Sequence, residues 1–184
     1  MKKKFRFAVF GIVLLYMLGM SGCGVNHKTP EGVVTSLIKS YAEGKVKKIR
    51  DCYGVKKNED ENLETQIDAT IKYIQAHNAE KVEIQECEIL AEQDTYTYVY
   101  ITYNMILDSK DEYPCISTYM VGKEEKKYYV LSPEKVTEEM SAEAAEVYAE
   151  FMKTDTYKDY TTKYDTFIKK NPGYEEKIAG KLNG

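Results

Sequence analysis

The stretch that most constrains the fold runs from residue 95 to residue 107, with the sequence TYTYVYITYNMIL. Its alternate positions form two sets, one mostly apolar and one rich in tyrosine: Val99, Ile101, Tyr103, Met105 and Leu107, against Tyr96, Tyr98, Tyr100, Thr102 and Asn104. Period-two alternation of β-branched and aromatic residues predicts a β-strand. One face should pack on an aliphatic core, and the other should carry tyrosines whose hydroxyls meet water or a partner.

The first 22 residues are predicted to be a signal rather than part of the fold. Four basic residues precede an apolar run over residues 7–20, which is shorter than the ~20 residues of a membrane span. The following Ser21-Gly22-Cys23 resembles the bacterial lipoprotein signal, in which the cysteine receives a diacylglyceryl group and becomes the new N-terminus. A plain secretory signal followed by an incidental cysteine is the alternative.

Lipidation of Cys23 would place the mature protein on the outer face of a cell membrane. Two acyl chains hold a protein firmly, because each buried methylene contributes about 0.8 kcal/mol. Residues 24–28 are then expected to form a short flexible tether. Removing residues 1–22 leaves 22 basic and 30 acidic residues, a net charge of −8. This balance argues against nucleic acid as a partner and against electrostatic adhesion to anionic lipid.

Three helices are predicted before the sheet. The first begins with Thr29 as cap and ends at Gly44, and a short lysine-rich helix spans residues 45–53. The third carries an apolar stripe at helical spacing and ends near His77 and Asn78. At that position His77 can gain from the helix dipole as a C-terminal cap, and a catalytic role for it is the alternative.

Four strands are predicted to form an antiparallel meander, over residues 81–91, 95–107, 115–121 and 127–131. In the first, Val82 and Ile84 have one parity, and Cys87, Ile89 and Ala91 have the other. A β-bulge near residues 85–86 would bring all five to the core face.

The three remaining cysteines, Cys52, Cys87 and Cys115, allow at most one internal disulfide, and the sequence does not choose the pair. Buried free thiols are the preferred interpretation. No spacing typical of a metal site is present, and no cofactor is predicted.

Helices followed by a curved antiparallel sheet resemble the cone of the nuclear transport factor two-like (cystatin-like) fold. Four features of the sequence look like those of small secreted lipoproteins of Gram-positive bacteria that carry such a domain, of unknown function. They are Cys23, the helix start at residues 29–31, the helix stop at 42–44 and the closing strand at 127–130. The resemblance implies an α+β fold over residues 29–133, with N-terminal helices packed on a four-stranded sheet. It implies no biochemical activity.

A helical C-terminal extension is predicted over residues 134–184. Its second helix carries an aromatic stripe: Tyr157, Tyr160, Tyr164, Phe167 and Ile168. The stripe can bind a partner, or it can dock on the tyrosine face of the sheet in the same molecule, which is the preferred interpretation because exposed aromatic stripes are rare in monomers.

Two classes of function follow. The first is a lipid-anchored, non-catalytic binding or scaffold module for an unknown protein or small molecule, with its binding surface at Tyr96, Tyr98, Tyr100 and Tyr119. The second is an enzyme of the cone fold, an isomerase or hydrolase with a buried carboxylate. The acids available for it are Asp68 and, if the bulge in the first strand is absent, Glu86 or Glu88.

Overall fold

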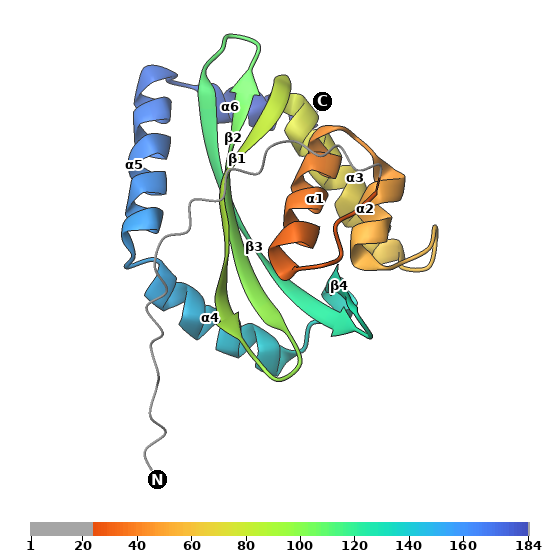
Figure 1. The fold of residues 1–184 in the computed structure, drawn as a ribbon. Coiled ribbons are helices and arrows are strands. Elements are labelled where there is room, and N and C mark those ends of the chain that lie inside the picture. The colour runs from red at the N-terminus through yellow and green to blue at the C-terminus, as the bar shows by residue number, and fades with distance from the viewer. Residues whose placement is uncertain (1–23, 184) are drawn as a thin grey trace.

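The computed structural model describes residues 24–183, so the predicted signal and the predicted lipidation site Cys23 lie outside the described residues. Three helices precede a four-stranded sheet, and three helices follow it (Figure 1). The chain is therefore an α+β protein. Its elements are α1 (Pro30–Ala42), α2 (Val46–Tyr53), α3 (Glu61–Ala76), β1 (Ala79–Glu92), β2 (Thr97–Leu107), β3 (Glu112–Glu124), β4 (Lys127–Val130), a 3₁₀ turn (Pro133–Lys135), α4 (Glu138–Phe151), α5 (Asp155–Lys170) and α6 (Tyr174–Asn183).

The helices begin where the sequence places capping residues. Thr29 accepts a hydrogen bond from the amide of Gly32. Thr137 accepts one from the amide of Met140. Such bonds satisfy amide groups that have no partner within the first turn. The helix predicted to follow Thr137 is thus confirmed. The last segment, for which the sequence gives a weaker pattern, forms the ten-residue helix α6, which packs against α3.

The sheet is an antiparallel meander in the order β1-β2-β3-β4. The register of β1 against β2 shifts between Ile84 and Glu86, which confirms the predicted bulge. A second shift, between Ile89 and Ala91, was not predicted. Ile89 lies before the shift and pairs with Val99, although its side chain is 36% exposed. After the shift, Ala91 pairs with Tyr98 and packs with Leu90 on the opposite face. The expectation that all five apolar residues of this strand share one face is therefore wrong for Ala91 alone, because Ile89 pairs with Val99 of the main core.

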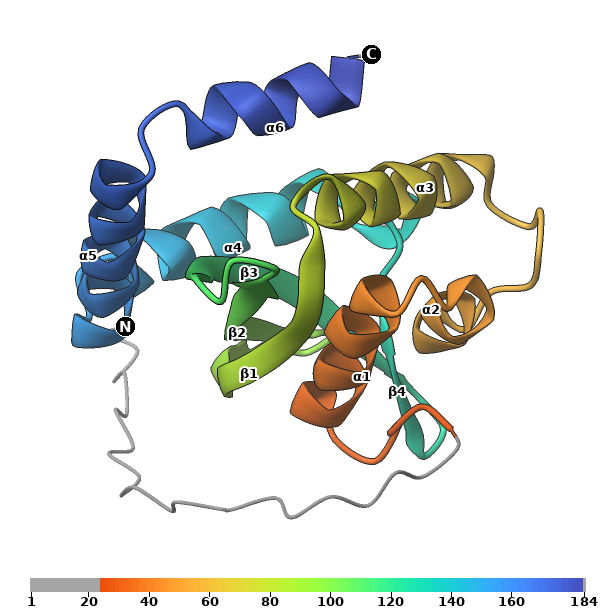
Figure 2. The same cartoon turned by 90° about the horizontal axis from the view of Figure 1, so that it is seen from above.

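Helices cover both faces of the curved sheet (Figures 1 and 2). Helices α1 to α3 bury one face, where Leu37 and Ile38 pack with Val99, Ile101 and other residues of the main core. Helix α4 lies against the tyrosine face, and α5 runs alongside β3. The tyrosine face, defined by Tyr96, Tyr98 and Tyr100, is therefore covered by the C-terminal helices of the same chain.

The aromatic stripe of α5 does not dock as one unit. Tyr157 contacts Phe151 at the end of α4, with ring centroids 5.8 Å apart. Phe167 instead joins the main core beside Tyr113, with centroids 5.1 Å apart. The preferred interpretation is correct in that the stripe docks within the molecule. It docks on two separate regions rather than on the tyrosine face alone.

The segment preceding α1 is attached to the domain. Val25 packs against the main core, and the backbone of His27 pairs with that of Tyr128 in β4. The expectation of a flexible tether over residues 24–28 is therefore wrong for residues 25–28. Across residues 24–183, no helix combines the length and the apolar character needed to cross a membrane.

Candidate functional site

The tyrosines predicted as a binding surface are buried. Tyr96, Tyr98 and Tyr100 are only 3%, 7% and 5% exposed, respectively. Their hydroxyls are already bonded within the protein. The Tyr98 hydroxyl donates to Oγ1 of Thr118 at 3.0 Å, and the Tyr100 hydroxyl donates to Oε2 of Glu86 at 3.1 Å. These three side chains hold α4 on the sheet and do not present an accessible surface.

Tyr119 does not belong with the other three. It pairs with Val99 across β2 and β3, and so it points to the face covered by α1 to α3. Burial raises the pKa of its hydroxyl, with a further increase from the nearby Tyr41. The prediction of one surface made by all four tyrosines is therefore wrong. The mistake arose because Tyr119 was assigned from sequence without the register of β3 against β2.

The carboxylates considered for an enzyme are all exposed. Asp68 lies on the outer side of α3, and Glu86 and Glu88 lie on β1. The Tyr100 hydroxyl lies within hydrogen-bond distance of both glutamates, at 3.1 Å and 3.4 Å. Burial raises the pKa of Tyr100, and the two glutamates add to the increase, so its hydroxyl stays neutral and donates a proton to the bond. None of the three acids is the desolvated carboxylate that the enzyme hypothesis requires.

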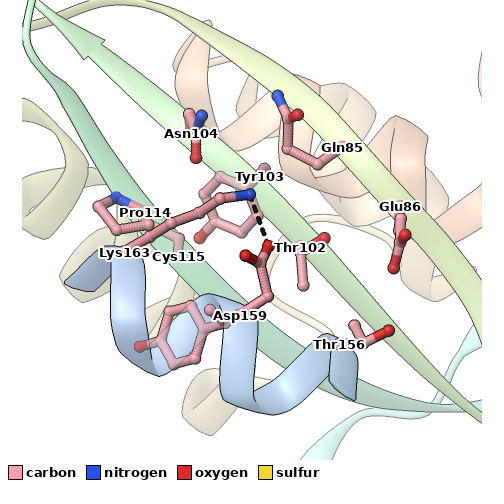
Figure 3. A pocket seen from close by; sticks show the side chains of 11 residues that line it. Gln85, Glu86, Thr102, Tyr103, Asn104, Pro114, Cys115, Thr156, Asp159 and Lys163 are labelled. Carbon is pink, nitrogen blue, oxygen red and sulfur yellow. Dashed lines mark ion pairs between the residues drawn. The ribbon is translucent and has the colours of Figure 1, made fainter. Parts of the chain in front are cut away.

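One polar cleft lies between α5 and the tyrosine face, and Figure 3 shows its lining. Its volume is about 160 Å³. From the sheet side it is lined by Gln85, Glu86, Thr102, Tyr103, Asn104, Pro114 and Cys115, and from the helix side by Thr156, Asp159, Tyr160 and Lys163. The cleft is thus a junction of three strands with one helix.

The charged groups of the cleft neutralise each other in part. The Nζ atom of Lys163 lies 2.6 Å from Oδ2 of Asp159, one helical turn away (Figure 3). Asn104 donates a hydrogen bond to Oε2 of Glu112, so its amide is already engaged. Most ligand pockets enclose about 300–1,000 Å³. The cleft is smaller, and can hold a few water molecules or a group of several heavy atoms.

A second cluster surrounds His77 and is called the aromatic junction here. Its members come from α3, β3, α5 and α6, and they are Tyr73, His77, Tyr113, Tyr164 and Tyr174. His77 is 3% exposed, and its Nδ1 lies 2.9 Å from the Tyr174 hydroxyl. Its Nε2 is buried, without a hydrogen-bond partner. The junction joins the N-terminal helices to the C-terminal extension.

Burial lowers the pKa of His77 to about 4. His77 is the C-cap of α3, and Asn78 follows with a positive φ of 54°, so the predicted position at the helix end is confirmed. The expected gain from the helix dipole is wrong, because that gain needs a charged imidazole. Sequence reasoning missed Tyr174, which lies 97 residues further along the chain and carries no local signal of the contact.

The three cysteines of the described chain are free thiols, which confirms the preferred interpretation. Burial raises the pKa of Cys52, Cys87 and Cys115 to about 12 in each case. They are therefore protonated and poorly reactive at neutral pH. Among residues 24–183, no three side chains of the kinds that bind metals are grouped closely enough to hold an ion.

Comparisons with known proteins identify no family for this chain, so its classification stops at the fold class. No family model and no curated protein sequence matches the chain. Among solved structures, one match is a 2.00 Å crystal structure of a Campylobacter jejuni protein described as an NTF2-like transpeptidase. The two share 15% identity and a TM-score of 0.39, over 56% of this chain and 98% of the other. The chain's own topology defines it as an α+β protein with an antiparallel sheet between two helical layers.

Proposed function

We propose that this protein is a lipid-anchored, extracytoplasmic binding module without catalytic activity, whose partner is a protein or a small molecule. The observation that carries the proposal is that helices close both faces of the sheet, so that the centre of the domain is a packed core. An enzyme of a cone-shaped fold needs an open cavity containing a desolvated acid or base. The three acids considered for that role are exposed.

The anchor is supported by the sequence before the domain. Ser21-Gly22-Cys23 follows a basic and then apolar segment, in the order of a bacterial lipoprotein signal. The described fold begins directly after it, with Val25 already packed on the core. The partner would then meet the outer surface of the domain. The cleft under α5 is the candidate contact point, since donor and acceptor groups converge there from two sides.

The experiment that tests the anchor is mass spectrometry of the N-terminal peptide after expression of the full chain in a bacterium. We expect the mature chain to begin at Cys23, to carry the mass of a diacylglyceryl group and to fractionate with membranes. The matched control is Cys23→Ser, which leaves every described residue unchanged and should remain unlipidated. A wild-type chain that keeps residues 1–22, or one released without lipid, would contradict the proposal.

A further inference from the structure

Residues 25–28, which lie between the predicted lipid site and α1 and which we call the clamp, are bound to the domain through Val25, Asn26 and His27. The amide of Asn26 donates to Oγ of Ser36 at 3.1 Å, and the amide of Lys28 donates to Oδ1 of Asn26 at 3.1 Å. The amide of Tyr128 donates to the carbonyl of His27 at 3.0 Å, which extends the edge of β4 by one pairing. These contacts join the clamp to both α1 and the sheet.

The His27 side chain completes the clamp. Its Nδ1 lies 2.7 Å from the Tyr128 carbonyl, and its ring centroid lies 4.6 Å from that of Tyr129. Its Nε2 is 3.6 Å from Oδ1 of Asp51 in α2. A side chain with three such partners on two elements fixes the direction in which the backbone leaves the domain.

Two glycines make room for this arrangement. A Cβ atom at Gly32 would lie 2.5 Å from Nδ2 of Asn26, and one at Gly54 would lie 2.9 Å from the Tyr129 ring. Gly54 also has a φ of +67°, which disfavours other residues. The clamp and its aromatic support therefore fit only because these two positions lack side chains.

Only Gly24 separates the clamp from Cys23, and two peptide units span no more than ~7 Å. A lipid on Cys23 would hold the surface around the clamp close to the phospholipid headgroups. Three exposed lysines belong to this surface. Lys28 follows His27, Lys47 lies one helical turn before Asp51, and Nζ of Lys123 is 5.1 Å from the Tyr128 ring centroid.

Helix α4 packs on the tyrosine face of the sheet, whereas α2 belongs to the layer on the opposite face. Helix α4 carries five glutamates and lies across the sheet from α2, as Figure 2 shows. The net charge of −8 over residues 23–184 disfavours adhesion of the mature chain to an anionic surface, and the surface around the clamp carries Asp51, Glu124 and Glu125 beside its lysines. The position of this surface next to the headgroups therefore has to come from the short attachment rather than from charge. The fixed, short attachment would then select an orientation, and the acyl chains would supply the affinity.

We propose that the clamp makes the protein's attachment rigid and docks the surface formed by α2, the clamp and the β3–β4 hairpin on phospholipid headgroups. This inference rests on the proposed lipidation of Cys23. The occupant of the docking surface is the membrane itself. The helices of the C-terminal extension would consequently face away from the membrane, where a partner can reach the cleft under α5.

Lysine footprinting on vesicles tests this orientation. The chain from Cys23 onward, which holds every described residue, is coupled through Cys23 to a maleimide lipid in phosphatidylcholine vesicles containing a minor fraction of phosphatidylglycerol. Cys52 is buried, Cys87 and Cys115 are half-buried, and the pKa values of all three are raised to about 12, so that their thiols stay protonated and Cys23 is the reactive cysteine. We expect acetylation of Lys28, Lys47 and Lys123 to fall several-fold relative to the uncoupled chain, and acetylation of Lys163 and Lys169 on α5 to stay unchanged.

The matched control is a flexible Gly-Ser insertion between Gly24 and Val25, which leaves the clamp and the fold intact but lengthens the attachment. Protection of the three lysines should disappear in this variant. The proposal would be overturned if coupling left the acetylation of Lys28, Lys47 and Lys123 unchanged relative to the uncoupled chain, or if their protection survived the insertion. Because the lipid is attached chemically, a negative result here is distinct from a failure of lipidation in cells.

Discussion

At the level of single residues, His77 shows how burial changes what a side chain can do. A histidine at a helix C-terminus gains stability when it is charged. Here Tyr73, Tyr113 and Tyr174 surround the ring and exclude water, and the pKa falls to about 4. The neutral ring accepts or donates one hydrogen bond, to Tyr174, and links α3 to α6.

This burial predicts a pH dependence of stability. The unfolded chain binds a proton at His77 near its ordinary pKa of 6.5, whereas the folded chain binds it only near 4. Between these values the unfolded state holds more protons, so the free energy of unfolding falls as the pH drops from 6.5 to 4. The shift corresponds to about 3 kcal/mol. The His77→Gln variant keeps a polar partner for Tyr174 and cannot titrate in this range.

Urea unfolding of wild type and His77→Gln at several pH values from 7 to 4 measures this effect. The difference between the two proteins in free energy of unfolding should shift by about 3 kcal/mol in favour of the variant as the pH falls through this range. Other groups titrate equally in both proteins and cancel in the difference. A difference that is independent of pH would show that His77 is not buried as a neutral ring.

At the level of elements, the features that could be predicted from the sequence are those that depend on residues close together along the chain. The caps at Thr29 and Thr137 and the bulge near residue 85 follow from local patterns, and all three are present. The second bulge, near Leu90, was missed because the apolar pattern over residues 87–91 has the parity of an unbroken strand. The residues at this bulge, Leu90 and Ala91, pack with Tyr96, Tyr98 and Ala144, a contact that is visible only in three dimensions.

The candidate site was harder to predict than the fold. The cleft combines residues 85–86, 102–104, 114–115 and 156–163, and no motif in any of these segments signals the others. The clamp was missed for the same reason, because residues 25–28 are polar and short, and their partners in β4 lie about 100 residues away. Composition alone therefore suggested a free tether.

The C-terminal helices provide a prediction at this scale. Helices α4 and α5 cover the tyrosine face, and Phe167 belongs to the main core. A chain truncated after Ser132 should therefore expose Tyr96, Tyr98 and Tyr100, bind the dye ANS and unfold with lower cooperativity than the full chain. Dye fluorescence and thermal unfolding monitored by circular dichroism measure the two effects.

A full-chain variant with Lys169→Ala on the exposed side of α5 is the control, because it changes the same helix without removing a buried contact. It should behave like wild type in both measurements. If the truncated chain were as stable as the full chain and bound no dye, residues 29–133 would form an independent domain and the extension would be an accessory.

At the level of the whole molecule, the protein is a sheet enclosed between two helical layers (Figures 1 and 2), and the segment before α1 is fixed to the domain. The main core extends from α1 through the sheet to Phe167 of α5. The cleft under α5 is too small for most ligands. This organisation supports binding of a partner at the outer surface of the domain. The fixed N-terminal segment would hold that surface in a defined orientation.

The central claim is that both faces of the sheet are closed, and tyrosine nitration of the folded full-length mature chain tests it most directly. Tyr73 is 38% exposed and serves as the internal reference, while Tyr98 and Tyr100 are almost fully buried. Nitrated peptides are quantified by mass spectrometry under conditions in which circular dichroism shows the fold to be intact. The account predicts modification of Tyr73 with little or none of Tyr98 and Tyr100. Modification of Tyr98 and Tyr100 at the rate of Tyr73 would contradict it, because the tyrosine face would then be open to a ligand.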